Sequence, residues 1–283
     1  MTTEAYLHRL GHDHEEPTVD YLFALHRAQV ERVPYENLEI ILGRPTTIAS
    51  GESTGRIVAG RGGYCYHLNG AFGALLRELG FTVRTHVGGV HRLGAEPVGA
   101  NGNHAVLTVE GLPTAECPDG IWFVDAGLGD AIHEPLPART GEYRQGPFTY
   151  RLDPSAVAVP GWHFTHAPGG SFGGMDFDAA AVAGIERFAP DHAELSAPGS
   201  HFTKMVVCQR RDSLGAHILR DARLTRWDAA GKAHLDLRHA VEWRAVWADV
   251  FGIVLTPDEV DRLWPDAVKR TEIWLAEQAT EAS

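Results

Sequence analysis

The stretch RGGYCYHLNGAFGALLRELG, residues 61–80, places one cysteine between a glycine pair and a run of apolar residues with helical spacing. The apolar positions of that run are Leu68, Phe72, Leu75, Leu76 and Leu79, and Gly80 is a typical stop. We therefore expect a helix that begins at or just after Cys65. Unpaired N–H groups at a helix start favour a thiolate, the reactive form of cysteine, although most lone cysteines are small buried residues.

The segments around this helix change character along the chain. Residues 21–30 have helical spacing, and Val33-Pro34 interrupts it. From residue 81 the chain is rich in short β-branched or aromatic runs, at residues 81–90, 104–110, 121–125, 147–152 and 201–211. Helical patterns return at residues 240–251, 256–264 and 266–278. This order predicts an α+β fold.

A helix start is also predicted near residue 256. Thr256 and Glu259 fit a capping box, and Pro257 then occupies the first helical position.

Composition narrows the class of protein. The chain has 283 residues, 44% hydrophobic and 22% charged, as expected for a globular protein with a large core. Three cysteines without a CxxC pair argue against a disulfide framework or a structural zinc site. The net charge of −12 argues against nucleic acid as a partner, and no apolar run predicts a membrane span or a signal peptide. We expect a cytoplasmic protein that binds no metal, and the HDHEE run at residues 12–16 lacks a fixed geometry for one.

Two of the strand-like runs suggest partners for the cysteine. Residues 104–110 and 121–125 flank a turn-rich segment, so a hairpin is the simplest connection. If Glu110 pairs with Asp119, then His104 lies opposite Asp125 on the same face of the hairpin. Directly opposite Cβ atoms are ~4.5–5.5 Å apart, close enough for an imidazole–carboxylate hydrogen bond. Cys65, His104 and Asp125 would then form a nucleophile, a base and an orienting group.

Four motifs, in order along the chain, resemble those of the arylamine N-acetyltransferases. VPYENL (residues 33–38) is similar to the VPFENL-type motif of that family, and RGGYCYHLN (61–69) to its RGGxCxExN motif around the catalytic cysteine. NHAVLTVEG (103–111) resembles the histidine strand, and FVDAGLGD (123–130) resembles the VDVGFG segment.

The resemblance implies a fold of three parts: an N-terminal helical bundle (residues 1–85), a β-barrel (86–190) and an α/β lid (191–283), around a papain-like Cys-His-Asp core. It also implies that Cys65 takes an acetyl group from acetyl-CoA as a thioester and passes it to an aromatic amine or hydrazine. His104 and Asp125 would complete the triad.

The resemblance implies two further features of the site. The turn of Gly127, Leu128 and Gly129 would approach the CoA phosphates through its backbone N–H groups. Glu36 and Arg61 would form an ion pair beneath the site.

Two residues depart from the family pattern. His67 stands where glutamate is usual, and Leu128 stands where phenylalanine is usual. His67 is an alternative base by residue type, but positions i and i+2 of a helix do not face each other.

Three alternatives remain open. The first is an amide synthase that moves an acyl chain from an acyl carrier protein to an amine, with the same triad. The second is a papain-like hydrolase. Such hydrolases have longer separations along the chain between the catalytic cysteine, the histidine and the third residue, and this alternative leaves VPYENL unexplained. The third is a catalytically silent binding protein that has kept the fold.

Overall fold

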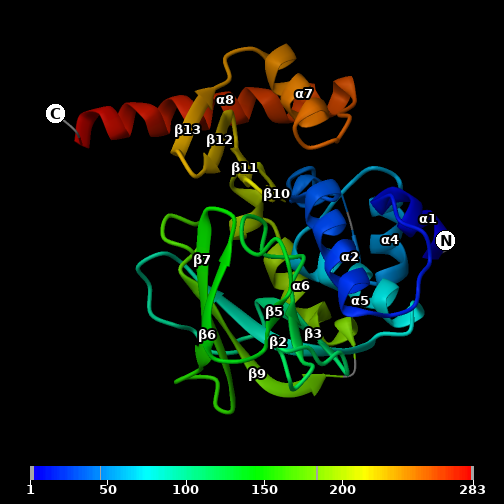
Figure 1. The fold of residues 1–283 in the computed structure, drawn as a ribbon. Coiled ribbons are helices and arrows are strands. Elements are labelled where there is room, and N and C mark those ends of the chain that lie inside the picture. The colour runs from blue at the N-terminus through cyan, green and yellow to red at the C-terminus, as the bar shows by residue number, and fades with distance from the viewer. Residues whose placement is uncertain (1–2, 45, 183, 282–283) are drawn as a thin grey trace.

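The structure is a computed structural model that describes residues 3–44, 46–182 and 184–281. Helices gather at one side of the molecule, a large curved sheet lies beside them, and a second sheet with two helices covers both (Figure 1). The arrangement is α+β, as predicted, with a nearly closed barrel sheet. The three residue boundaries expected from the sequence stay a prediction.

The N-terminal helices build the support for Cys65. They are α1 (Thr3–Leu10), α2 (Val19–Arg32), α3 (Leu38–Ile41), α4 (Ser50–Val58) and α5 (Cys65–Glu78). The side chain of Thr18 caps α2 by accepting a hydrogen bond from the backbone N–H of Tyr21. The apolar positions predicted for this helix are all buried in a core shared with α1, α2 and α4, and the last of them, Leu79, lies just after α5 ends. The predicted helix start at Cys65 is confirmed.

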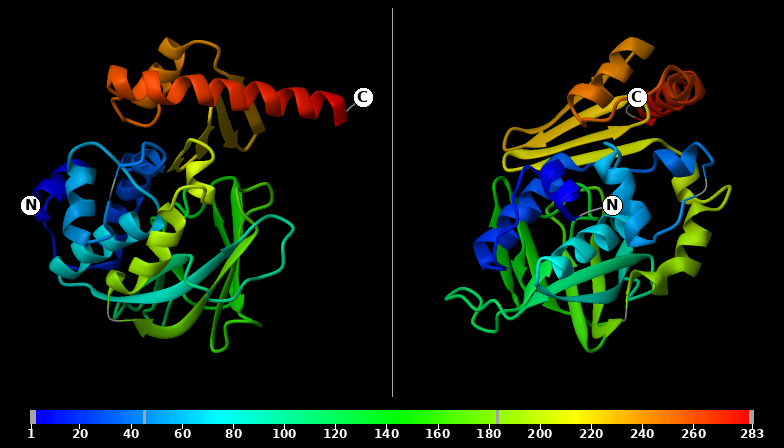
Figure 2. Two further views of the ribbon diagram at one scale, coloured as in Figure 1. Left: turned by 180° about the vertical axis from the view of Figure 1, so that it is seen from behind. Right: turned by 90° about the vertical axis from the view of Figure 1, so that its right-hand side faces the viewer.

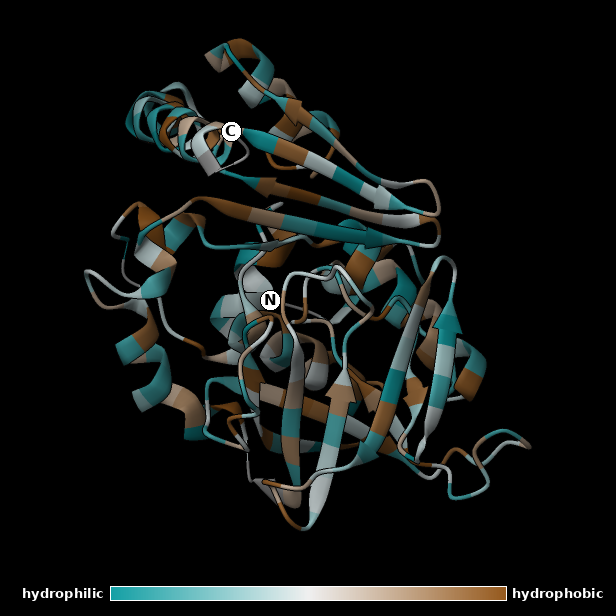
Figure 3. Cartoon of the chain, turned by 90° about the vertical axis from the view of Figure 1, so that its left-hand side faces the viewer, coloured by the Kyte–Doolittle hydropathy of each residue, from teal (hydrophilic) through white to brown (hydrophobic). Residues whose placement is uncertain are grey.

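The larger sheet is antiparallel and carries His104 and Asp125. Its strands are β2 (Thr82–His91), β3 (His104–Glu110), β4 (Trp122–Val124), β5 (Leu136–Pro137), β6 (Gly141–Gln145), β7 (Phe148–Pro154), β8 (Gly161–Thr165) and β9 (Gly174–Val182). The order in the sheet is β5-β4-β3-β2-β9-β8-β7-β6. Phe123, Phe164 and Phe177 stack in its interior, so the curved sheet encloses an aromatic core. Figure 3 shows the strands curving around this interior.

A connecting segment leads from the barrel to the smaller sheet. It contains the short helical turns η1 (Ile185–Phe188) and η2 (His201–Thr203), with α6 (Ala189–Ser196) between them. The sequence predicted a strand over residues 201–211, but the strand begins only at Val207, because residues 201–203 form η2.

The smaller sheet, which we call the lid sheet, has the order β1-β10-β11-β12-β13. Its strands are β1 (Tyr35–Glu36), β10 (Val207–Asp212), β11 (Gly215–Arg220), β12 (Arg223–Asp228) and β13 (Gly231–Asp236). The VPYENL motif thus supplies an edge strand to a sheet whose other strands come from the C-terminal third of the chain. This pairing fixes the lid sheet against the helical part.

Two helices cover the lid sheet, α7 (Ala240–Asp249) and α8 (Pro257–Glu281) (Figure 2). The capping box is confirmed: Thr256 and Glu259 exchange hydrogen bonds, and Pro257 begins α8. The sequence suggested two helical segments separated at Pro265, but α8 runs through this proline. Trp243 and Trp247 of α7 are fully buried, so apolar packing holds α7 in place.

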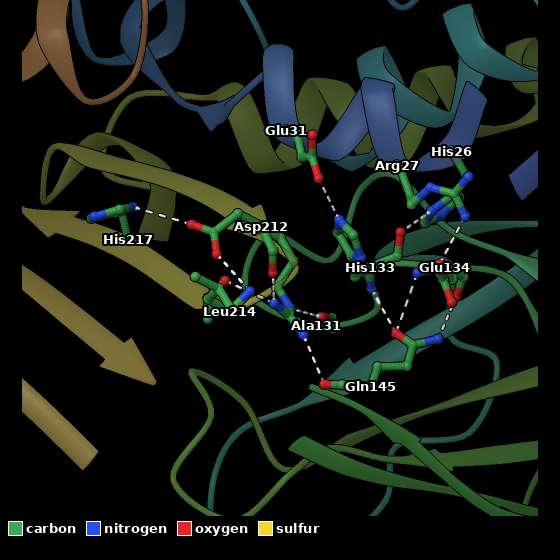
Figure 4. A network of polar contacts seen from close by, with 12 residues as sticks. His26, Arg27, Glu31, Ala131, His133, Glu134, Gln145, Asp212, Leu214 and His217 are labelled. Atoms are coloured by element: carbon green, nitrogen blue, oxygen red, sulfur yellow. Dashed lines mark hydrogen bonds and ion pairs between the residues drawn. The ribbon is translucent and has the colours of Figure 1, made fainter. Parts of the chain in front are cut away.

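A polar network joins the helical part to the barrel and the lid sheet (Figure 4). From α2, Glu31 lies 2.6 Å from Nε2 of His133, and Arg27 donates to Glu134 at 2.8 Å. The side chain of Gln145 on β6 bonds the backbone of the same loop. Arg211 of β10 is fully buried and donates from Nε to the carbonyl oxygen of Ala131 at 2.9 Å. The loop that contains Ala131, His133 and Glu134 is therefore bonded to α2, to β6 and to β10.

Among the described helices, none is long and apolar enough to cross a membrane.

Candidate active site

Cys65 is the first residue of α5 and is only 4% exposed. The loop before it packs tightly, because a Cβ atom at Gly62 would collide with the carbonyl oxygen of Pro34. The backbone N–H of Gly62 donates to the carboxylate of Glu36 at 3.1 Å, and the N–H of Glu36 donates to the carbonyl of Gly63 at 2.9 Å. The glycine pair thus lets the VPYENL segment and the cysteine loop lie side by side.

The hairpin predicted to carry His104 and Asp125 exists, with a shifted register. Thr108 pairs with Phe123 and Leu107 pairs with Val124, two residues away from the predicted pairing. A shift of two keeps every side chain on its predicted face, because strand side chains alternate with period two. His104 and Asp125 are therefore diagonal neighbours rather than direct partners. Nε2 of His104 lies 2.7 Å from Oδ2 of Asp125, and both residues are buried.

The charge state of His104 follows from its neighbours. Burial on its own lowers the pKa of His104, but the Asp125 carboxylate and the Cys65 sulfur raise it, through charge and hydrogen bonding, to about 10. The imidazole is therefore held as an imidazolium at neutral pH. It lies between a carboxylate and a thiol, as a cysteine nucleophile requires.

Asn69 completes the hydrogen bonding of Asp125. Its Nδ2 donates to Oδ1 of Asp125 at 2.8 Å and to the carbonyl of Ala105 at 2.7 Å. Its Oδ1 accepts from the backbone N–H of Ala126 at 2.8 Å. Asn69 is a residue of the site that was not predicted from the sequence. The available signal was its position four residues after Cys65, one turn along the same helix face.

The predicted ion pair between Glu36 and Arg61 is wrong. Arg61 instead pairs with the carboxylate of Glu259, which also binds Arg44 at 2.7 Å. Glu36 is buried and accepts hydrogen bonds from two backbone N–H groups, of Gly62 and Leu38. Burial raises the pKa of Glu36. Arg61 therefore fixes the cysteine loop to the lid helix α8.

His67 does not take part in the cluster around Cys65. Its imidazole packs edge-on against Tyr64, with ring centroids 4.8 Å apart, and also lies against His192. Burial holds the pKa of His67 well below its usual value, so it is neutral. His67 is not among the residues that line the cavity of Cys65 in the described structure.

The glycine turn after Asp125 lies directly against the cysteine. A Cβ atom at Gly127 would come within 2.6 Å of the Cα atom of Cys65, so only glycine fits there. The backbone N–H of Gly127 donates to Oδ1 of Asp125 at 2.8 Å. Gly127 and Leu128 line the cavity, and at Gly129 a Cβ atom would collide with the side chain of Gln209. Contact of this turn with a CoA phosphate stays a prediction.

Cys65 and His104 open into a cavity of about 350 Å³. Its walls come from the helical part, the barrel sheet and the lid sheet. Its aromatic and apolar members are Tyr35, Val90, Leu128, Phe172, Leu195, Phe202, Met205 and Val207. Asn37, Asn103, Gln209 and Arg220 also line it, so apolar and polar groups converge on Cys65 in a cleft of the size that small molecules occupy. The described residues contain no group of three or more side chains able to hold a metal ion, and that includes the HDHEE run.

Comparisons with known proteins identify the family of the chain. Residues 18–260 match the family model described as N-acetyltransferase. The arylamine N-acetyltransferase of Mycolicibacterium smegmatis is 36% identical over 151 residues, which are 51% of this chain and 53% of that protein. Proansamycin X synthase of Amycolatopsis mediterranei is 30% identical over 157 residues, covering 53% and 57% of the two chains. The chain thus spans about half the length of the curated relatives it matches.

The structural match extends over nearly the whole chain. The Mycobacterium marinum arylamine N-acetyltransferase, solved in complex with CoA, superposes with a TM-score of 0.81 and 25% identity, over 95% of this chain and 99% of that one. The family match, the relatives and the fold all indicate the same group of transferases. The chain belongs to the arylamine N-acetyltransferase family.

Proposed function

We propose that the protein transfers an acetyl group from acetyl-CoA to an aromatic amine or hydrazine through a thioester on Cys65. The observation that carries the proposal is the buried group of Cys65, His104 and Asp125, at the floor of a cavity large enough for a small molecule. Family membership supports the transferase chemistry, and the CoA complex of the Mycobacterium marinum protein supports the donor.

In the first half-reaction the Cys65 thiolate attacks the carbonyl carbon of the acetyl group. Nε2 of His104 is held by Asp125, so Nδ1 is the nitrogen that exchanges a proton at the site. As the bond between the acetyl carbon and the CoA sulfur breaks, the imidazolium gives its proton to the departing CoA thiolate. Acetyl-Cys65 and free CoA result.

In the second half-reaction the amine attacks the thioester carbon. Neutral His104 accepts the proton that the amine nitrogen loses, and the Cys65 thiolate departs. Asp125 stabilises the imidazolium that forms again. The enzyme then returns to its starting state. Because CoA leaves before the amine reacts, the kinetics are ping-pong.

The test is the intact mass of the protein after incubation with acetyl-CoA and no amine. We expect one acetyl adduct, removed by hydroxylamine and absent in Cys65→Ala. Addition of an arylamine should discharge the adduct and yield the N-acetyl product. Absence of any adduct from acetyl-CoA and from an activated ester would refute the proposal.

The second candidate is an amide synthase that takes its acyl group from a carrier protein. This candidate is supported by the relative named proansamycin X synthase, which is 30% identical to this chain over 157 matched residues. The same mass measurement separates the two: an adduct from an acyl carrier protein but none from acetyl-CoA would establish the amide synthase.

A further inference from the structure

Two strands that are far apart in the chain present polar side chains to the cavity of Cys65. Tyr35 of β1 and Gln209 of β10 are direct partners in the lid sheet. Directly opposite residues of an antiparallel pair point to the same side of a sheet, and both of these side chains line the cavity. The next pair, Glu36 and Cys208, points to the other face. The sheet edge therefore offers one tyrosine and one glutamine, side by side, to whatever enters the cavity.

The carboxamide of Gln209 has no hydrogen-bond partner within the protein. Gln209 is 5% exposed, so its side chain is almost wholly enclosed, and it lies against Gly129 of the glycine turn. In the part of the chain that the structure describes, neither polar atom of this carboxamide makes a hydrogen bond, and neither is sealed from solvent. The opening that the side chain lines is the cavity of Cys65. The carboxamide is thus available to a molecule bound there.

The hydroxyl of Tyr35 is also free. The Tyr35 ring packs against two apolar clusters, and its backbone bridges to Gly63 in the loop before Cys65. Among the described residues its hydroxyl has no hydrogen-bond partner, and this atom is not sealed inside the protein. Burial raises the pKa of Tyr35 well above its usual value, and the charges of Cys65, Asp130 and Glu36 raise it further. The hydroxyl is therefore protonated and able to donate.

The other amide side chains of the cavity already have partners. Asn37 bonds three backbone groups of residues 202–207, and Asn103 bonds both the N–H and the carbonyl of Val90. Of the three amide side chains that line this cavity among the described residues, Gln209 alone is free. The free groups thus occur as one adjacent pair.

We propose that Tyr35 and Gln209 select the acceptor amine by binding a neutral hydrogen-bonding substituent, such as a carboxamide, on its aromatic ring. The inference deepens the proposed function and rests on it, because the amine must come to the acetylated Cys65. The oxygen of the substituent would accept from the Tyr35 hydroxyl, and its NH2 group would donate to the carboxamide oxygen of Gln209. The Asp130 charge still acts on Tyr35 after Cys65 is acetylated, so a carboxylate substituent is disfavoured.

The test compares acceptor amines that differ in one substituent. p-Aminobenzamide carries a carboxamide where p-toluidine carries a methyl group, and the meta isomers extend the comparison. With acetyl-CoA as donor, kcat/KM for the benzamide divided by that for the toluidine should fall about fivefold in Tyr35→Phe and in Gln209→Leu, as expected for one lost hydrogen bond. Each variant is compared with wild type, so the intrinsic reactivities of the two amines cancel. The loss should lie mainly in KM for the benzamide.

Tyr143→Phe is the matched control. Tyr143 of β6 donates its hydroxyl to the carbonyl oxygen of Arg139 and does not line the cavity, so this variant removes the same atom elsewhere and should leave the ratio unchanged. Tyr35→Phe gives the VPFENL-type motif and should fold. An unchanged ratio in both Tyr35→Phe and Gln209→Leu, with Cys65 still acetylated, would overturn the inference alone. An equal fall for both amines would also overturn it, because the two side chains would then only support the cavity wall.

Direct binding tests the inference without acetyl transfer. Titration calorimetry should show that the affinity for p-aminobenzamide weakens about fivefold in Tyr35→Phe and in Gln209→Leu, while the affinity for p-toluidine changes less. If no acetyl adduct forms on Cys65, the proposed function fails, and the titration still decides whether these two side chains bind the substituent. Equal affinity of wild type and both variants for the benzamide would contradict it.

Discussion

Cys65 and Cys208 are both buried cysteines, 4% and 0% exposed, in very different surroundings. Cys208 lies in β10, opposite Glu36 of β1. Burial raises the pKa of the Cys208 thiol well above its usual value, and the nearby Glu36 carboxylate raises it further. Cys65 begins a helix, lines a cavity and has the His104 imidazolium beside it.

The difference shows that burial alone does not decide whether a cysteine is reactive. Burial and the Glu36 carboxylate raise the pKa of the Cys208 thiol and outweigh Arg210 and a backbone hydrogen bond at Gln209, so the thiol stays protonated. Beside Cys65 lies the His104 imidazolium, which is hydrogen-bonded to Asp125. Asp125 in turn accepts hydrogen bonds from Asn69 and from the Gly127 N–H. The contrast predicts that the two cysteines affect different properties of the protein.

The largest effects, on activity and on stability, are expected when Cys65 or Cys208 is replaced by serine. Cys65→Ser should lower acetyl transfer by at least about a thousandfold, because a serine hydroxyl is a much weaker nucleophile than a cysteine sulfur. Its midpoint of thermal unfolding should change little. Cys208→Ser should keep most of the activity but lose about 1–3 kcal/mol of unfolding free energy, because a hydroxyl is placed in an apolar core.

Steady-state kinetics and urea unfolding of both variants check the comparison. Cys117→Ser is a further control, because this third buried thiol lies away from the cavity, with its sulfur 3.2 Å from the carbonyl oxygen of Ile121. Acetyl transfer retained in Cys65→Ser, or lost in folded Cys208→Ser, would reverse the assignment.

The second prediction removes the charge that maintains the His104 imidazolium. Asp125→Asn should lower kcat/KM by about a thousandfold at neutral pH. The reason is that burial then acts on His104 without the carboxylate that opposes it, so the pKa of His104 falls.

The pH profile provides the more specific test of Asp125. In the wild type, the raised pKa of His104 contributes stability that is complete below the ordinary value near pH 6.5. It is lost as the pH rises through about 10. The acylation rate of the wild type should therefore stay constant up to an alkaline limb near pH 10. In Asp125→Asn this limb should begin at a lower pH. A limb at the same pH in both proteins would show that Asp125 does not set the charge of His104.

Parts of this site were predictable because they depend on local sequence. The helix from Cys65 follows from periodicity within one segment, and Gly80 ends it at a backbone φ of 90°. The faces of His104 and Asp125 follow from the alternation of a strand. The exact register does not, because the turn at residues 111–121 sets it, and composition alone does not fix how many of those residues pair.

Other parts depend on partners far away in the chain. Arg61 pairs with Glu259, which is 198 residues away along the chain, and not with Glu36, which is closer in sequence. Strands β11 to β13 were not predicted from the sequence. β12 has two buried residues and β13 has none, so the apolar pattern of these two strands is weak. Gln209 lies beside Tyr35 in the cavity of Cys65 only because β10 pairs with β1, which is far away in the sequence.

A smaller effect is expected at Asn69, which supports the Cys65 side of the comparison. Asn69→Ala should lower kcat about tenfold and destabilise the fold by about 1–3 kcal/mol, because it leaves buried hydrogen-bonding groups of Ala105 and Ala126 without a partner. The alkaline limb of the pH profile should stay closer to that of the wild type than in Asp125→Asn. Stopped-flow acylation with acetyl-CoA measures the rate, and a variant as active and stable as wild type would remove Asn69 from the positioning group.

The smallest effect is expected at Glu259, which ties the lid that contains Cys208 to the loop that carries Cys65. Burial alone would raise the pKa of Glu259, but the Thr256 N–H, Arg44 and Arg61 together hold it below its usual value. Such a carboxylate contributes stability that is present above pH ~4.5 and is lost as the pH falls through its lower pKa in the folded protein.

Glu259→Gln should therefore cost about 1 kcal/mol of unfolding free energy at pH 7, and the difference from wild type should shrink in acid. Glu272→Gln, at an exposed position of the same helix, is the matched control and should cost almost nothing. Because Arg61 immediately precedes the glycine pair, Glu259→Gln should also slow the acetylation of Cys65 slightly while leaving the buried state of Cys208 unchanged. A loss of stability that is constant across pH would mean that the carboxylate charge is not what joins the lid to the cysteine loop.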